Sequence, residues 1–402
     1  MSCQCYTDGT VIRSLTARVI ILVLLLCLSL IFSCSSSPED VFDTLQSDDS
    51  AEQDISRREQ LVLTFAGDIM AHTPNFKMRD YSRIYDDIRT YLKGDDFTFG
   101  NLEMPVADTL PMSTYPRFNV HSSYLQAAID GGFDVFSLAN NHSNDQYYAG
   151  IDGTLSAFSS RPLSHYSGLR RSENEELQPR LILHNGWRIL FLSVTEILNS
   201  HDKTMDRVYY SSPGDKGRAL LLSSLKQMTL DIPHDVFILS LHVNQPEYER
   251  TVRQSTRDWF AELADAGVDV VWAHHPHVMH EWEQTGLHFF MYSMGNFISG
   301  QRYTPNTNDP GADREYTGDA VLLRLSLSRY AGERGFDKIE HVPVLITNQT
   351  LNNGDVVVRR LTNEFIQSLP QTWKTYYAKR KELMESYLPA LLADAQKAIL
   401  EQ

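Results

Sequence analysis

Apolar residues in this chain gather in short runs that polar loops separate. The run Leu61–Ala66 ends at Gly67-Asp68, which is the pattern of a buried strand that leads into a loop. Further strands are predicted at Phe97–Gly100, Asp134–Leu138, Leu181–Leu183, Arg188–Val194, Val236–Leu241, Val268–Ala273, His288–Tyr292 and Ala320–Leu327. The Asn185-Gly186 pair between two of these strands is typical of a hairpin, so part of the sheet is expected to be antiparallel.

Helical periodicity fills the segments between the strands. Helices are predicted at Tyr81–Leu92, Ser123–Gly131, Gly150–Ser159, Arg218–Leu230 and Arg253–Ala266. Strands that alternate with helices predict an α/β core. From Asn363 through Gln402 the pattern predicts one or two amphipathic helices that pack against this core. Their expected apolar positions are Phe365, Leu369, Trp373, Tyr377, Leu383 and Leu391.

The N-terminal segment has the features of an export signal. Arg13 and Arg18 precede the apolar run Val19–Phe32, which has the length of a secretory signal and is short for a membrane span. It ends at Ser33-Cys34, similar to a loose bacterial lipobox in which Cys34 is lipidated; an uncleaved anchor and ordinary cleavage are the alternatives. We expect a signal peptide over residues 1–34, a flexible tether over 35–58, and a lipid-anchored location in the bacterial cell envelope, outside the cytoplasm.

Composition and charge restrict the chemistry of the folded part. With 402 residues, 42% of them hydrophobic, the chain is long enough to bury a full core. The formal net charge of -15 argues against nucleic acid or an anionic lipid surface as the main partner. All the cysteines lie at or before Cys34. This excludes a disulfide framework and thiolate metal ligands, so a metal site would need oxygen and imidazole nitrogen.

Polar residues recur just after the predicted strands, where open α/β sheets place their ligands. The loops concerned are Gly67-Asp68, Gly100–Glu103, Ala139–His142, Leu241-His242, His274–His277 and Gly295–Phe297. Each alone is weak evidence, since an Asp or Asn there more often caps a helix or forms a turn. Three histidines within four residues are stronger evidence, because clustered imidazoles cost stability unless they bind something or stay exposed. The combined set predicts a site for Mn, Fe, Zn or Mg.

The amino-acid sequences and the order of these loops resemble the motifs of a known family, the CapA-like poly-γ-glutamate capsule synthesis proteins of the calcineurin-like metallophosphoesterase superfamily. The motifs are AGDIM, FGNLE, GFDVFSLANNHSNDQYYAGI, LSLHVNQPEY, AHHPHV and YSMGNF, between Leu61 and Leu327. The resemblance implies a metallophosphoesterase-like sandwich of two mixed β-sheets flanked by helices, with metals at one edge. We expect this domain at residues 59–345, and a C-terminal strand and helical extension packed on it at 346–402.

The resemblance also implies roles for particular side chains. Metal ligands would be Asp68, Glu103, Asn141, His242, His275 and His277. His142 would protonate a leaving group or stabilise the transition state, and Asp145 would orient it. Hydrogen bonds to the ligands are expected from Asn101, Asn140, His274 and Asn296. Two divalent ions would lower the pKa of a bridging water and stabilise both oxygens of an in-line displacement.

Some positions depart from the family's common pattern. Val243-Asn244 follows His242 where the family usually has Trp-Gly, and Ala273 stands where a glycine often opens the motif. His72 stands where many members carry a glycine or a basic residue. It is either a substitute ligand or an ordinary surface histidine, and the surface position is favoured. These departures concern the shape of the substrate cleft more than the metals.

The sequence leaves three functions open. The first is a hydrolase that cleaves a phosphoester or another bond in an envelope polymer or its precursor, with subunits of a polymer-synthesis complex as partners. The second is a binding or export factor whose metals bind an anionic polymer such as poly-γ-glutamate without breaking a bond. The third is a scaffold without metal that uses its C-terminal helices as an interaction surface.

Overall fold

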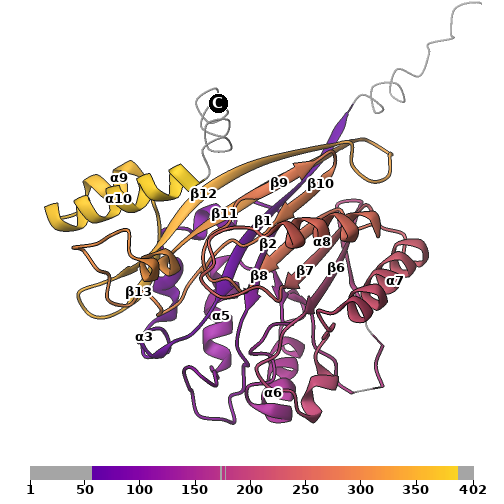
Figure 1. The fold of residues 1–402 in the computed structure, drawn as a ribbon, viewed down its shortest axis with the longest axis horizontal. Helices are drawn as coiled ribbons and strands as arrows, with labels where there is room; N and C mark the ends of the chain where they lie inside the picture. Colours follow the sequence, from indigo (N-terminus) through magenta and orange to yellow (C-terminus); the bar gives the residue numbers. More distant parts are fainter. Residues whose placement is uncertain (1–56, 173, 177, 388–402) are drawn as a thin grey trace, which may run out of the picture. The chain divides into compact units, whose positions relative to one another are not determined.

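Two β-sheets lie at the centre of the computed structural model, which describes residues 57–172, 174–176 and 178–387 (Figure 1). The strands are β1 (Arg58–Ile69), β2 (Phe97–Leu102), β3 (Val135–Ser137), β4 (His165–Ser167), β5 (Arg180–His184), β6 (Trp187–Thr195), β7 (Val236–His242), β8 (Val270–His274), β9 (Trp282–Thr285), β10 (His288–Met291), β11 (Asp319–Tyr330), β12 (Lys338–Thr350) and β13 (Val356–Arg360). The predicted signal peptide, Cys34, nearly all of the tether and Leu391 lie outside the described residues.

Both sheets mix parallel and antiparallel strands, as predicted. The seven-stranded sheet has the order β13-β12-β11-β1-β2-β3-β4, and its strands β1 to β4 run parallel. The six-stranded sheet has the order β5-β6-β7-β8-β10-β9, with β6, β7, β8 and β10 parallel. The Asn185-Gly186 turn joins the antiparallel pair β5 and β6, also as predicted. The carboxyl ends of the parallel strands are the positions at which the candidate side chains occur.

Alternating side chains join the two sheets into a sandwich. Phe65 of β1 and Phe99 of β2 point into the layer between the sheets and meet aromatic residues of the other sheet. The ring centroids of Phe65 and Trp272 are 5.7 Å apart, and those of Phe99 and Phe191 are 5.5 Å apart. Such edge-to-face pairs stabilise a core beyond the area they bury. The fold is therefore the two-sheet sandwich that the resemblance implied.

Helices bury the outer apolar faces of the sheets. The helical elements are α3 (Thr73–Phe76), η1 (Tyr81–Tyr85), α4 (Arg89–Leu92), α5 (Ser122–Gly131), α6 (Tyr147–Ser159), η2 (Lys203–Arg207), α7 (Asp215–Asp231), α8 (Gln254–Asp265), η3 (Asp313–Gly318), α9 (Asn363–Gln367) and α10 (Gln371–Tyr387). Trp259 and Phe260 of α8 pack with Phe237 and Leu239 of β7 in one apolar cluster. Figure 1 shows α7 and α8 beside β6, β7 and β8.

Several elements differ from the sequence expectation. The helix expected at Tyr81–Leu92 is two short pieces, η1 and α4. The carboxylate of Asp87 between them accepts a hydrogen bond from the backbone N–H of Arg360 of β13. Strands β4, β9 and β12 were not predicted, because they are very short or carry many polar residues, whereas β13 lies within residues 346–402, for which a C-terminal strand was expected. Strand β12 runs across residue 345 and pairs with β11 on both sides of it.

The C-terminal helices pack on the sandwich. Tyr376, Tyr377 and Met384 of α10 are buried and belong to the cluster between the sheets. None of the helices in the described part of the chain combines the length and apolarity that a bilayer crossing requires.

Candidate metal centre

Two buried carboxylates lie close together at the carboxyl ends of β1 and β2. Asp68 is the next-to-last residue of β1, and Glu103 directly follows β2. Asn101 donates hydrogen bonds from Nδ2 to Asp68 Oδ1 at 2.9 Å and to Glu103 Oε2 at 3.1 Å. Among the described residues, the ion-pair partners of these two acids are histidines only. Two buried acids without a lysine or arginine are costly unless another cation balances them.

Four histidines surround these carboxylates. His242 and His274 are the last residues of β7 and β8, and His275 and His277 follow in the next loop. His275 and His277 have positive φ angles of 102° and 58°, which L residues adopt only at an energetic cost. With this backbone, His277 Nε2 lies 3.6 Å from Glu103 Oε1, and the rings of His242 and His275 are 5.0 Å apart. Strain of this kind is typical of functional loops.

Hydrogen bonds fix the orientation of two of these rings. Nδ1 of His277 lies 3.1 Å from both Asp68 Oδ2 and Asn296 Oδ1. Nδ1 of His274 lies 3.0 Å from Asp68 Oδ1. Because the partners are acceptor oxygens, Nδ1 carries the proton, and Nε2 of each ring keeps its lone pair for a cation. Asn101, His274 and Asn296 thus hydrogen-bond Asp68, Glu103 or His277, and Asn140 donates to Asn101 Oδ1 at 3.3 Å.

Several ligand-type atoms in this cluster have no hydrogen-bond partner among the described residues. They are Glu103 Oε1, Asn141 Oδ1, both ring nitrogens of His242, His274 Nε2 and His275 Nδ1. A buried polar atom without a partner costs about 1–3 kcal/mol. The unpaired atoms are carboxylate and amide oxygens and imidazole nitrogens, which are the ligand atoms that hard and borderline divalent ions bind. The residues present therefore fit a divalent metal.

Burial shapes the acidity of the cluster. It raises the pKa of Glu103 well above its usual range, and the charge of Asp68 adds to this effect. Burial also raises the pKa of Asp68, but hydrogen bonds from two neighbouring imidazoles outweigh it and hold that pKa well below its usual range. Burial lowers the pKa of His242 well below its usual range and the pKa of His275 to about 4. These two imidazoles are therefore neutral at physiological pH, the form that binds metal.

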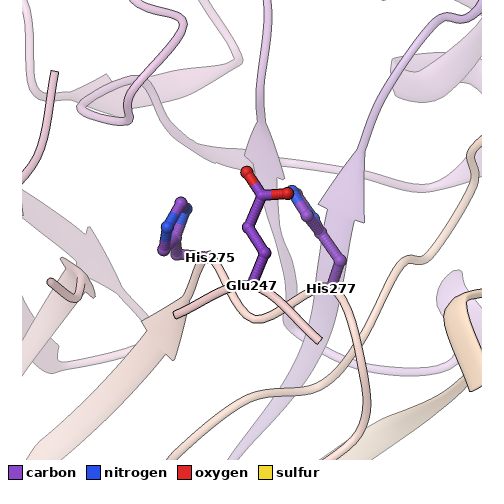
Figure 2. Close-up of side chains that lie close together, drawn as sticks. All are labelled: Glu247, His275 and His277. Carbon is purple, nitrogen blue, oxygen red and sulfur yellow. The ribbon is translucent and has the colours of Figure 1, made fainter. Parts of the chain in front are cut away.

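Two groups of ligand atoms are close enough to hold an ion. One consists of Asp68, Glu103 and His277, and the other of Glu247, His275 and His277; within each group the atoms lie within 4.8 Å of one another. Figure 2 shows the carboxylate of Glu247 between the two imidazoles. Glu247 was not predicted as a ligand from the sequence. The available signal was an acid five residues after His242, within the motif LSLHVNQPEY.

Asn141 has a different environment from the other proposed ligands. Its backbone carbonyl accepts from Asn199 N at 3.0 Å, and its Nδ2 faces Asn199 Oδ1 at 3.5 Å. These contacts hold the amide by its nitrogen and leave Oδ1 unpaired. Asn199 was not predicted, because it lies after β6, outside every quoted motif.

His142 and Asp145 form a hydrogen-bonded pair beside this cluster. Nδ1 of His142 lies 2.7 Å from Asp145 Oδ2, and both side chains are buried. The same carboxylate oxygen accepts from the backbone N–H of Phe118 at 2.7 Å, which fixes its position. The ring of Phe118 packs edge-on against His142 at 4.7 Å. Asp145 thereby orients the imidazole with Nδ1 as donor, which leaves Nε2 for proton transfer.

A cleft of about 850 Å³ opens at this cluster. His142, Glu247 and His277 line it on the side of the ligands, and Tyr248 lines it as well. His72 is also part of the wall, half-buried, although the sequence favoured an ordinary surface position. The cleft is large enough for a small substrate or one unit of a polymer.

Two solved structures are similar to this chain. A solved phosphatase from Mycoplasma pneumoniae aligns with 72% of this chain and 95% of its own, at a TM-score of 0.42 and 14% identity. A hypothetical protein from Thermus thermophilus aligns with 71% and 99%, at a TM-score of 0.42 and 15% identity.

The sequence relatives are capsule proteins. Capsule biosynthesis protein CapA of Bacillus anthracis is 26% identical over 274 residues, and the match spans 61% of this chain and 61% of that relative's length. PGA biosynthesis protein CapA of Bacillus subtilis (strain 168) is 22% identical over 315 residues, which cover 76% and 78%. The model of the family described as bacterial capsule synthesis protein PGA_cap matches residues 62–301, well over half of the chain. With its strand-end loops gathered at one cleft, this chain belongs to the bacterial capsule synthesis protein family PGA_cap.

Proposed function

We propose that this protein is a metal-dependent hydrolase of the phosphoesterase type. The observation that carries the proposal is the set of buried, unpaired ligand atoms beside an open cleft. A binding protein would also use such a set, but the adjoining His142 and Asp145 pair favours catalysis, because metal binding alone does not require it. Family membership supports an envelope polymer or its precursor as the source of the substrate.

The chain's own residues divide into metal ligands and a proton donor. We propose two divalent ions, Mn, Fe, Zn or Mg, held by Asp68, Glu103, Asn141, His242, His275 and His277, with Glu247 as an additional ligand. Divalent ions bound there would lower the pKa of water and stabilise negative charge on a phosphoryl oxygen. His277 is held by Asp68 and Asn296, so that its Nε2 stays directed at the cluster.

His142 is the general acid of the proposed reaction. As an imidazolium, His142 would donate Nδ1–H to Asp145 and transfer its Nε2 proton to the departing oxygen of the substrate when the bond breaks, which leaves a neutral ring with the proton on Nδ1. Asn199 Nδ2 lies 3.4 Å from Nε2 and can donate to it in the neutral ring, whose proton is on Nδ1. A positioned general acid of this kind contributes about 10²–10⁴-fold to the rate.

Turnover by the purified protein tests this function. Aryl phosphates, phosphodiesters, γ-glutamyl peptides and peptidoglycan fragments would be supplied with each of Mn, Fe, Zn and Mg. We expect hydrolysis of at least one phosphoester, its loss with a chelator and its return when metal is restored. A protein that hydrolyses none of these but retains an anionic polymer only in the presence of metal would contradict the hydrolase and support the binding factor.

We further propose that the protein works at the cell envelope, outside the cytoplasm, on a lipid anchor at Cys34. The support is the leader sequence, with basic residues before an apolar run and a cysteine at its end. Labelling of cells with a fatty-acid analogue tests the anchor. Label on the wild-type protein and none on Cys34→Ala is expected, and no label on the wild-type protein would contradict it.

A further inference from the structure

His72 occupies a defined position in the wall of the cleft. It stands directly before the short helix α3, and its backbone N–H donates to Asn75 Oδ1 at 3.0 Å. Its ring packs edge-on against Phe118 at 5.1 Å, and the same Phe118 packs against His142. His72 and His142 thus share one aromatic neighbour and line the same cleft.

The backbone of Gly300 sets the tautomer of His72. Gly300 N–H donates to His72 Nδ1 at 3.1 Å. A nitrogen that accepts a hydrogen bond holds a lone pair, so the proton of the neutral ring is on Nε2. An imidazolium would place two N–H groups against each other at this contact. The close approach requires glycine, because a Cβ on Gly300 would lie 2.6 Å from His72 Cβ.

This arrangement removes His72 from the set of metal ligands. Nδ1 is occupied by Gly300, and Nε2 carries a proton in the tautomer that this bond selects. His72 also belongs to neither ligand group in the described part of the chain. The substitute-ligand role considered from the sequence therefore requires breaking the Gly300 contact.

We propose that His72 Nε2–H is a fixed, uncharged donor that binds an oxygen of the substrate's phosphoryl group in the cleft. This inference rests on the proposed phosphoesterase function and adds a substrate contact to it. No acceptor for Nε2 occurs among the residues that the structure describes, so its donor capacity is available to a ligand in the cleft. A donor whose position and tautomer are fixed before binding stabilises an anionic oxygen without reorganisation.

The acidity of His72 agrees with this geometry. Burial lowers the pKa of His72 to about 4, and the nearby His277 and His142 act in the same direction. The ring therefore stays neutral at physiological pH, and its donor does not depend on protonation. A neutral imidazole acting as a donor in an active site is an established catalytic arrangement in other enzymes.

Binding of inorganic phosphate to the full-length, Mn²⁺-loaded protein tests the proposal by titration calorimetry. His72→Ala is expected to weaken phosphate binding about 10-fold to 100-fold, the usual loss for a hydrogen bond to a charged group. His72→Gln places an amide N–H near the position of Nε2 and is expected to recover most of the affinity. His201→Ala removes an exposed histidine and is expected to change nothing. Metal content and thermal unfolding establish that each variant is folded and loaded.

Nitrogen-15 spectra of histidine-labelled protein give a second readout that needs no activity. We expect His72 with an unprotonated Nδ1 and a protonated Nε2 across about pH 5–8. The proposal is overturned if Nδ1 carries the proton, or if wild type and His72→Ala bind phosphate equally. If wild type hydrolyses a phosphoester while His72→Ala keeps its KM and phosphate affinity, this inference fails alone. If wild type neither binds phosphate nor hydrolyses a phosphoester, the proposed function fails with it.

Discussion

Two buried clusters of charged side chains in this protein balance their charges in different ways. At the strand ends, Asp68 and Glu103 are buried with histidines and without a lysine or arginine among their described ion-pair partners. At the C-terminal side, Asp319 is buried between Arg302 and Arg380. The first cluster leaves carboxylate, amide and imidazole atoms unpaired, whereas the second pairs both oxygens of its carboxylate with guanidinium groups of the chain, although Arg302 Nε and Arg380 Nη2 stay unpaired.

The second cluster has a structural purpose. Asp319 Oδ1 accepts from Arg302 at 2.8 Å and Oδ2 accepts from Arg380 at 2.6 Å. Arg302 also donates to the backbone carbonyls of Glu315 and Gly318. The network therefore ties α10 to β11 and to η3, whose residues form part of the cleft wall. A buried carboxylate that has cationic partners within the chain serves the fold, and buried carboxylates that lack lysine and arginine partners require another cation.

Loss of an imidazole from the cluster around Asp68 and Glu103 should have the largest effect on turnover. His275→Ala is expected to lower turnover at least about 100-fold, more than the 10–100-fold typical of residues that only support ligands. In metal-free protein the same change should not lower the unfolding temperature, because it removes a buried imidazole with an unpaired Nδ1. Metal analysis, turnover and thermal unfolding measure these effects, with His201→Ala as control. If the metal-free variant has an unfolding temperature well below that of metal-free wild type, the proposed difference between the two clusters is contradicted.

The cluster around Asp319 should respond in the opposite way. Asp319→Ala leaves two buried guanidinium groups without their shared carboxylate and is expected to lower the free energy of unfolding by about 3–5 kcal/mol. Urea unfolding measures this loss. Glu382→Ala, which breaks an exposed pair with Lys379, is the control and should leave stability nearly unchanged. An equal, small effect of both substitutions would show that Asp319 is not essential to the fold.

His142 should separate catalysis from metal binding. His142→Gln is expected to lower kcat about 100-fold or more while metal content stays at the wild-type level, because the residue is placed as a proton donor. His121→Gln, at the start of α5, is a matched control without access to this pair. Loss of metal together with activity would instead make His142 part of the metal cluster.

An acid outside both clusters gives the expected pH dependence of stability. Burial raises the pKa of Asp235, but hydrogen bonds from Arg188 and from backbone N–H groups outweigh it and lower that pKa to about 2. Because the pKa is lower in the folded state than the unfolded value of about 3.9, the stabilisation is complete above about pH 4 and is lost between about pH 4 and 2. Asp235→Asn should therefore flatten the stability profile within this range. Urea unfolding at several pH values measures this profile. If the free energy of unfolding of the variant falls between about pH 4 and 2 as steeply as that of wild type, the lowered pKa of Asp235 is contradicted.

The sequence predicted the parts of the molecule that depend on local pattern. Apolar runs ending in Asp68, His242 and His274 identified strands whose carboxyl ends meet, so the sequence alone grouped the candidate ligands. Strand β12 was missed, because polar residues interrupt its apolar positions and it is held by pairing with β11 along most of its length.

The cleft wall was the least predictable region. Gly300 meets His72 across more than two hundred positions of sequence, and no spacing rule relates them. Glu247 and Asn199 join the centre from loops whose composition is ordinary for a surface. Such contacts depend on how the two sheets pack, and the spacing of apolar residues along the sequence does not predict this packing.

Metal analysis of the purified full-length protein, before and after incubation with Mn, Fe, Zn and Mg, tests the central claim most directly. The unpaired atoms around Asp68 and Glu103 predict that a divalent ion stays bound in stoichiometric amount through gel filtration and is lost in Asp68→Ala. A folded wild-type protein that retains none of these ions would contradict the metal centre.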